Sequence, residues 1–280
     1  MTHPIGPEAP QGIAAALAAC RVVDLSVPLD VRTGCSWPGH VRYQHWTTNW
    51  FAESDAAGAV VTDRLGAYYT ATVVMDEHTG THIDAPAHHI APPGSGLPAA
   101  GPAGAITADV VELSELIGRA RVIDATGLVR AAAAGVSPRV EVALLEEHEA
   151  AFGPVIAGDI VLIRSDWDRR LSPGTDPDAY AASPLAGREP GWPAPSEDFI
   201  SALLARGVRT VGTDGPSMGA CDEGVGAHRI GLGEGMTFIE GMGGLGELPA
   251  ATAAVVFLGL KIVGGSGAPG RAVGLVPREG

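Results

Sequence analysis

Cysteine is scarce in this sequence. Only Cys20, Cys35 and Cys221 occur among 280 residues, no two of them form a C-x-x-C pair, and their number is odd. This pattern argues against a disulfide framework and predicts a cytoplasmic protein, because thiols stay reduced in that compartment. The N-terminus also lacks a basic stretch followed by an apolar run, so we expect no signal peptide.

Basic residues and long apolar runs are also missing. The chain has 18 Lys and Arg against 32 Asp and Glu, which gives a net charge of -14. A nucleic-acid backbone requires clustered basic side chains, so we expect no nucleic-acid partner. No apolar run approaches the roughly 18 residues that a membrane-spanning helix needs, so we expect no membrane partner. Hydrophobic residues still make up 46% of the chain, enough to build a core.

Apolar segments with strand character alternate with helical patterns along the chain. Strands are predicted within residues 21–29, 67–76, 120–124, 155–167, 208–214, 236–239 and 253–263. Helices are predicted at residues 13–20, 140–151 and 197–206, with a short one at the end of 108–117. Strands that outnumber helices and alternate with them favour an α/β fold, as one domain with a mixed sheet. The stretch 171–195 is rich in proline and glycine, and we expect it to be a long surface excursion.

Four potential metal ligands lie within eleven residues. The segment His78-Thr-Gly-Thr-His82-Ile-Asp84-Ala-Pro-Ala-His88 holds three of the nine histidines. An isolated histidine usually caps a turn or sits satisfied in a core, but such a concentration indicates a metal site. Glycine, proline and β-branched threonines oppose a helix here, and a straight strand would hold residues four apart ~13 Å from each other. The chain must therefore bend between His78 and His82, and Gly80 permits that bend.

Imidazole and carboxylate together form a ligand set for Zn²⁺, Mn²⁺ or Fe²⁺ with one position left for water. Water bound in this way loses its proton near neutral pH and becomes a nucleophile. His78, His82 and Asp84 are thus the predicted ligands of a catalytic divalent ion.

The histidine segment resembles the signature of the metal-dependent cyclase/hydrolase family, which includes bacterial kynurenine formamidases and isatin hydrolases. Further blocks share the resemblance, and it extends over most of residues 21–263. They are Ser36-Trp-Pro-Gly39, Leu116-Ile-Gly118, Val122-Ile-Asp124, Gly158 to Arg164, Val211 to Ser217, His228-Arg-Ile230 and Phe238-Ile-Glu-Gly241.

The resemblance implies a swivelling β/β/α-type fold and a homodimer. It divides the chain into an N-terminal extension with a short helix (1–20) and a catalytic domain (21–280). It places one ion on His78, His82 and Asp84. In the formamidase branch, residues matching His88, His228 and Glu240 hold a second ion; in the isatin hydrolase branch, the residue matching His88 acts in catalysis. Insertions at 40–66 and 171–195 set this chain apart from the shorter formamidases.

These observations predict a hydrolase of a non-peptide amide, either an aryl formamide or a cyclic amide, with His88 or Glu240 as the proton donor. The alternative enzyme is a cyclase or dehydratase of secondary metabolism that uses the ion as a Lewis acid. A third possibility is a non-catalytic metal-binding protein. Trp37, Trp50 and Phe51 lie in turn-rich sequence, where they could bind a flat aromatic substrate or form a small separate core. His89 is expected at the surface or behind the ligands.

Overall fold

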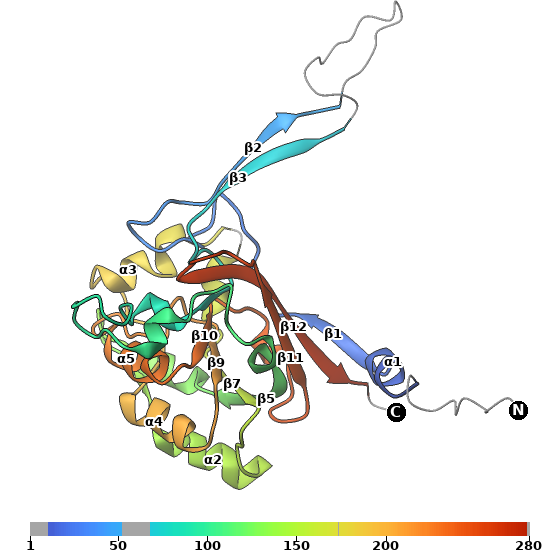
Figure 1. Ribbon diagram of the computed structural model, residues 1–280, viewed down its shortest axis with the longest axis vertical. Helices are drawn as coiled ribbons and strands as arrows, with labels where there is room; N and C mark the ends of the chain where they lie inside the picture. Colours follow the sequence, from blue (N-terminus) through green and yellow to red (C-terminus); the bar gives the residue numbers. More distant parts are fainter. Residues whose placement is uncertain (1–10, 52–67, 173, 279–280) are drawn as a thin grey trace, which may run out of the picture.

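The computed structural model describes residues 11–51, 68–172 and 174–278 (Figure 1). Residues 1–10 of the predicted N-terminal extension and residues 52–66 of the 40–66 insertion lie outside the described residues. The helices are α1 (Gln11–Ala18), α2 (Val142–Phe152), α3 (Ala182–Leu185), α4 (Glu197–Ala205) and α5 (Gly226–Gly233). The strands are β1 (Cys20–Asp24), β2 (Gln44–Asn49), β3 (Thr70–Val74), β4 (His82–Asp84), β5 (Ile117–Asp124), β6 (Arg139–Val140), β7 (Asp159–Arg164), β8 (Ala194–Pro195), β9 (Thr210–Thr213), β10 (Thr237–Glu240), β11 (Ala254–Gly259) and β12 (Gly267–Pro277).

The main sheet closes on itself. Its strand order is β1-β12-β11-β5-β7-β9-β10-β4, and β12 also pairs with β4, so seven of these strands form a barrel with β1 added on β12. Strands β5, β7, β9 and β10 run parallel to their neighbours in this group, whereas the pairs that involve β1, β4, β11 and β12 are antiparallel. The predicted single α/β domain with a mixed sheet is therefore confirmed.

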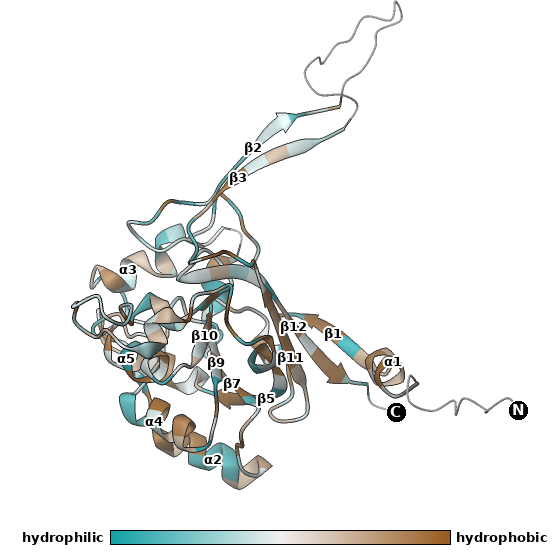
Figure 2. Cartoon of the chain, viewed as in Figure 1, coloured by the Kyte–Doolittle hydropathy of each residue, from teal (hydrophilic) through white to brown (hydrophobic). Residues whose placement is uncertain are grey.

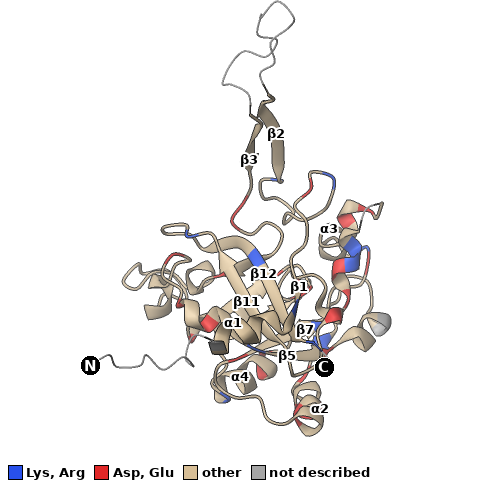
Figure 3. Ribbon diagram, turned by 90° about the vertical axis from the view of Figure 1, so that its right-hand side faces the viewer, with Lys and Arg blue, Asp and Glu red and all other residues tan. Residues whose placement is uncertain are grey.

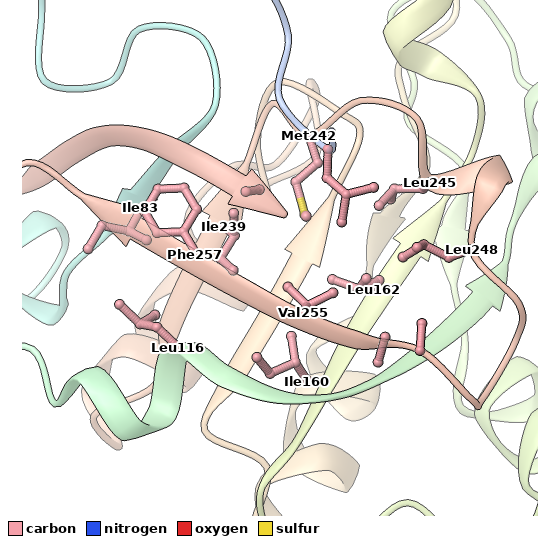
Figure 4. Packing of buried hydrophobic residues seen from close by; sticks show 14 of the residues in the cluster. Ile83, Leu116, Ile160, Leu162, Ile239, Met242, Leu245, Leu248, Val255 and Phe257 are labelled. Carbon is pink, nitrogen blue, oxygen red and sulfur yellow. The ribbon is translucent and has the colours of Figure 1, made fainter. Parts of the chain in front are cut away.

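Strand β7 shows how the two halves of the core are divided. Ile160 and Leu162 point into the barrel interior, where they meet residues such as Phe257 (Figure 4). Val161 and Ile163 alternate with them and pack outward against a second cluster that includes Phe199 of α4. Helices α2, α4 and α5 cover this outer face, with their apolar residues turned inward (Figure 2). Burial on both faces explains the nearly continuous apolar run of β7 in the sequence.

The prediction of a long surface excursion at 171–195 is only partly confirmed, because residues 174–177 and 185–188 are exposed but residues 180–181, 183–184 and 191–195 are buried. Trp192 and Tyr180 of this segment are buried, and they pack with Trp167 in a third cluster beside the barrel. Each buried polar atom has a partner, because the Trp192 indole N–H donates to the Gly219 carbonyl and the Tyr180 hydroxyl donates to the Asp214 carbonyl. Aromatic side chains with a bonded polar end can be buried in an irregular segment at little cost. The proline and glycine content therefore marked irregular backbone, not uniform exposure.

Strands β2 and β3 form a hairpin that projects from the barrel (Figures 1 and 3). Neither strand contains a charged residue, and Trp46, Val73 and Val74 are exposed on them. Within the described parts of the chain, no helix combines the length and the apolar character needed to cross a membrane.

Candidate metal centre and active site

The backbone bends between His78 and His82 as the sequence predicts. Gly80 adopts a φ of +66°, a left-handed conformation that glycine tolerates best. His82 and Asp84 then lie two residues apart on β4 and share one face of the sheet. Pro86 begins a short 3₁₀ helix that ends at His88 and returns this third imidazole toward the same point.

Asp84 lies at the centre of the cluster. Its Oδ1 is 2.7 Å from His78 Nδ1 and 3.4 Å from His82 Nε2. Its Oδ2 is 3.8 Å from His88 Nε2 and 3.5 Å from His228 Nε2. The carboxylate therefore presents one oxygen to each of two histidine pairs.

The sheet brings Glu240 to the same place. Strands β10 and β4 are antiparallel neighbours, and Glu240 lies directly opposite His82 in their register. Its side chain reaches within 3.7 Å of His82 Nε2 and 3.2 Å of His228 Nε2, and it accepts a hydrogen bond of 2.6 Å from the Met218 N–H. All six residues that the sequence nominated as ligands are thus brought together, although their roles as ligands remain predictions.

Backbone and hydroxyl groups fix which nitrogen of each buried imidazole carries its proton. His82 Nδ1 lies 2.9 Å from the Gly80 carbonyl, and His228 Nδ1 lies 2.7 Å from the Gly224 carbonyl, so each Nδ1–H donates outward. Each Nε2 faces the carboxylates, where it can bind a metal once it has lost its own proton. Metal-binding histidines are oriented in this way by partners behind them.

Two buried atoms at the centre have no hydrogen bond. Among the described residues, His82 Nε2 and Asp84 Oδ2 are fully buried and lack a hydrogen-bond partner. Leaving such atoms unsatisfied costs free energy, and a divalent ion removes that cost. Two triads have ligand atoms within 4.8 Å of one another, namely His78-His82-Asp84 and Asp84-His228-Glu240. The donor set therefore fits a divalent ion at the first triad and permits another at the second.

The protonation of the cluster follows from its packing. Burial alone would raise the pKa of Asp84, but the charge of His88 and the contacts from His228 and His78 hold this pKa well below its usual range. Burial also opposes the charged form of His228, but Asp84 and Glu240 outweigh it and raise the His228 pKa to about 10. Burial dominates at His88 and lowers its pKa. Burial thus favours the neutral form of His88, whose side chain is 28% exposed.

The cluster forms the floor of a pocket with a volume of about 300 Å³. The apolar part of its wall consists of Trp37, Leu185, Pro216, Ala220 and Val225. No Lys or Arg occurs among the described residues that line it. The Trp37 ring meets the buried Trp192 ring edge to face at 6.1 Å, which holds Trp37 in position.

Trp50 and Phe51 do not line this pocket in the single chain. They follow β2 on the projecting hairpin, where the Trp50 ring contacts both Phe51 and Tyr69. Their role in substrate binding remains a prediction, whereas Trp37 lies where that role requires it.

Two histidines that line the pocket were not assigned to the site from the sequence. His40 follows the Trp-Pro-Gly segment, lines the pocket and places its Nδ1 3.1 Å from Asp76 Oδ1. His89 also lines the pocket, where its ring stacks on that of His228 with centroids 4.3 Å apart. Burial and the charges of His228 and His88 lower the pKa of His89 to about 3. Adjacency to recognised motifs was the available signal for both residues.

The barrel, the buried carboxylate and the oriented imidazoles fit a metal-dependent enzyme. The family model described as "Putative cyclase" matches residues 23–220. The isatin hydrolase of Roseibium aggregatum is 31% identical over 213 residues, which cover 74% of each chain. The kynurenine formamidase of Salinibacter ruber is 31% identical over 253 residues, covering 90% of this chain and 96% of that one.

A solved structure agrees with these sequence matches. Isatin hydrolase A from Ralstonia solanacearum superimposes with a TM-score of 0.74 at 28% identity, covering 98% of this chain and all of that one. The chain belongs to the cyclase family, in which it is an enzyme similar to isatin hydrolases and kynurenine formamidases.

Proposed function

We propose that this enzyme hydrolyses a non-peptide amide bond in a small, flat substrate, either an aryl formamide or a cyclic amide. One observation carries the proposal: a buried carboxylate presents each of its oxygens to a pair of histidines on the floor of a pocket. The relatives named isatin hydrolase and kynurenine formamidase support the amide class. The apolar wall and the lack of described Lys or Arg in the lining favour a substrate whose non-reacting part is uncharged.

His78, His82 and Asp84 would hold the divalent ion, which is Zn²⁺ or Mn²⁺ from the nitrogen and oxygen donors present. Such an ion, when bound, polarises a carbonyl and lowers the pKa of coordinated water. His88 lies at the edge of this group with its side chain 28% exposed, so it can exchange protons with a substrate. Its Nε2 faces Asp84 Oδ2, and we propose that His88 takes up the proton that the attacking water releases and then passes it to the leaving nitrogen.

The reaction type is tested by oxygen-18 water and a screen of aryl formamides, lactams and lactones. A hydrolase incorporates the heavy oxygen into the carboxylate product, and we expect this with an aryl amide. Turnover without incorporation would instead establish a cyclase or dehydratase, the alternative in which the ion acts only as a Lewis acid. Metal binding without turnover of any compound in the screen would favour a non-catalytic metal-binding protein.

We further propose two ions per chain, with Asp84 between them and Glu240 and His228 on the second. Elemental analysis of protein loaded with zinc or manganese is expected to give about two equivalents, because both triads converge on Asp84. Glu240→Gln removes a charged ligand of the second triad and should lower the count to one. A single equivalent that Glu240→Gln leaves unchanged would assign Glu240 and His228 to substrate or proton handling.

The projecting hairpin leads us to propose a homodimer, as the family resemblance implies. Trp46 is 46% exposed on β2, and exposed aromatic side chains are enriched at protein interfaces. Light scattering at micromolar concentration should give twice the 28.4 kDa mass of the chain. Trp46→Glu should lower the measured mass toward that of a single chain. The control is Leu97→Glu, at another exposed apolar position. A wild-type protein that remains monomeric would contradict the proposal.

The three free cysteines are consistent with a cytoplasmic location, which we also propose.

A further inference from the structure

A chain of polar groups lies behind His78, on the side away from Asp84. Glu77 Oε2 accepts three hydrogen bonds from the start of β12: 2.8 Å from the Ser266 N–H, 3.0 Å from the Ser266 hydroxyl and 3.3 Å from the Gly267 N–H. The Ser266 Oγ also lies 3.0 Å from His78 Nε2. The described structure thus connects a carboxylate to the far side of a predicted metal ligand through one hydroxyl group.

The direction of these hydrogen bonds follows from counting protons. A serine hydroxyl has one proton, and an ionised carboxylate can only accept. Ser266 therefore donates its proton to Glu77 and has only lone pairs left for His78. The His78 Nε2–H then donates to Ser266, so Nδ1 is the nitrogen that gives up its proton when a divalent ion binds. Nδ1 is the atom that lies 2.7 Å from Asp84 Oδ1, within the first metal triad.

The backbone around Ser266 is shaped to hold this arrangement. A Cβ atom at Gly267 would lie 2.6 Å from the His78 ring, so glycine allows the start of β12 to pass directly beside the imidazole. The Ser266 carbonyl accepts a 2.9 Å hydrogen bond from the Ala85 N–H, next to Asp84. β12 is therefore fastened to the ligand-bearing strand at the point where Ser266 contacts His78.

We propose that Glu77 is a positioning residue that acts through Ser266 to keep His78 Nδ1 deprotonated and directed at the divalent ion. A carboxylate in this place favours one tautomer, restricts rotation of the ring and makes the imidazole a better donor. The inference rests on the proposed metal site but not on the reaction catalysed there.

Ser266→Ala separates this role from a merely structural one. The substitution removes the hydroxyl, but it retains both backbone N–H groups that anchor Glu77 to β12. If Glu77 acted only by fastening β12, Ser266→Ala would leave the metal affinity unchanged. Ser266→Thr restores the hydroxyl. Ser114→Ala is a matched control, because Ser114 Oγ also donates to a glutamate, Glu112, on the exposed surface.

The test measures Zn²⁺ affinity of the full chain by chelator competition, without substrate. Partners behind a metal ligand typically contribute about 10–100-fold in affinity. Ser266→Ala and Glu77→Gln should each weaken binding by about this factor, and the double variant by no more than the larger single effect. Ser266→Thr and Ser114→Ala should bind as the wild type does. Wild-type affinity in Ser266→Ala, or additive losses in the double variant, would overturn the proposal.

A second measurement uses the wild-type protein alone, so it does not depend on whether a variant folds. Long-range ¹H–¹⁵N correlation in the zinc-loaded wild type should show the one remaining His78 proton on Nε2. A wild-type proton on Nδ1 would also overturn the proposal. If the wild type binds metal tightly but hydrolyses nothing, the proposed reaction fails while this inference stands.

Discussion

His82→Ala is expected to abolish bound metal and activity together. His82 Nε2 is fully buried, has no hydrogen-bond partner and lies 3.4 Å from Asp84 Oδ1, so its lone pair has no evident role except ligation. Its removal leaves only His78 and Asp84 in the first triad, and two ligands hold an ion weakly. Lewis-acid catalysis is worth several kcal/mol, so we expect a rate loss of at least ~10³-fold.

Metal content and turnover should be measured on the same preparation of His82→Ala. His45→Ala is the matched control, since His45 is exposed on β2 and does not line the pocket at the metal cluster. The control should retain both properties. Full metal content in His82→Ala would refute the ligand assignment, whatever the activity of the variant.

The second large effect is expected at His88. His88→Ala should retain the ion of the first triad, because His78, His82 and Asp84 are untouched, yet it should lose about 10²–10⁴-fold in rate, as removal of a general acid–base group does. The loss should fall on kcat, since His88 would act on the proton and not on the apolar part of the substrate.

A smaller loss would reveal another proton donor. Near-normal turnover in His88→Ala with normal metal content would remove His88 from the mechanism and leave Glu240 as the candidate acid. The metal content of His88→Ala also reports on the second triad, because a drop by one equivalent would make His88 a ligand there.

The first triad could be predicted because its geometry is local. His78, His82 and Asp84 lie within seven residues, and the bend at Gly80 follows from the distance between metal ligands. His228 and Glu240 are distant in sequence, and they were assigned only by the family resemblance. Their local sequence does not indicate that β10 pairs with β4. This pairing is what places Glu240 opposite His82.

Strand β12 and helix α5 were not predicted, because packing overrides local propensity in both. β12 contains three glycines and two prolines, which oppose a strand prediction from the sequence. The structure requires small residues there: a Cβ at Gly270 would lie 2.4 Å from the Leu258 carbonyl of β11. In α5, Gly231 packs under Phe238, where a Cβ would lie 2.4 Å from the ring. In both elements, glycine therefore allows a neighbouring part of the chain to pack closely against the backbone.

The partners of His78 were beyond sequence analysis for the same reason. Ser266 follows His78 by 188 residues, and it reaches the imidazole only because β12 closes the barrel against β4. Pairing in the barrel, not spacing in the chain, determines how the ligands are supported.

The central claim is that His78, His82 and Asp84 hold a divalent ion on the pocket floor. Diffraction data collected on either side of the zinc or manganese absorption edge test it most directly. We predict an anomalous peak about 2.0–2.3 Å from His78 Nδ1, His82 Nε2 and Asp84 Oδ1, with an open position facing the pocket. An ion coordinated elsewhere, or these three atoms without an anomalous peak in crystals grown with saturating metal, would contradict the account.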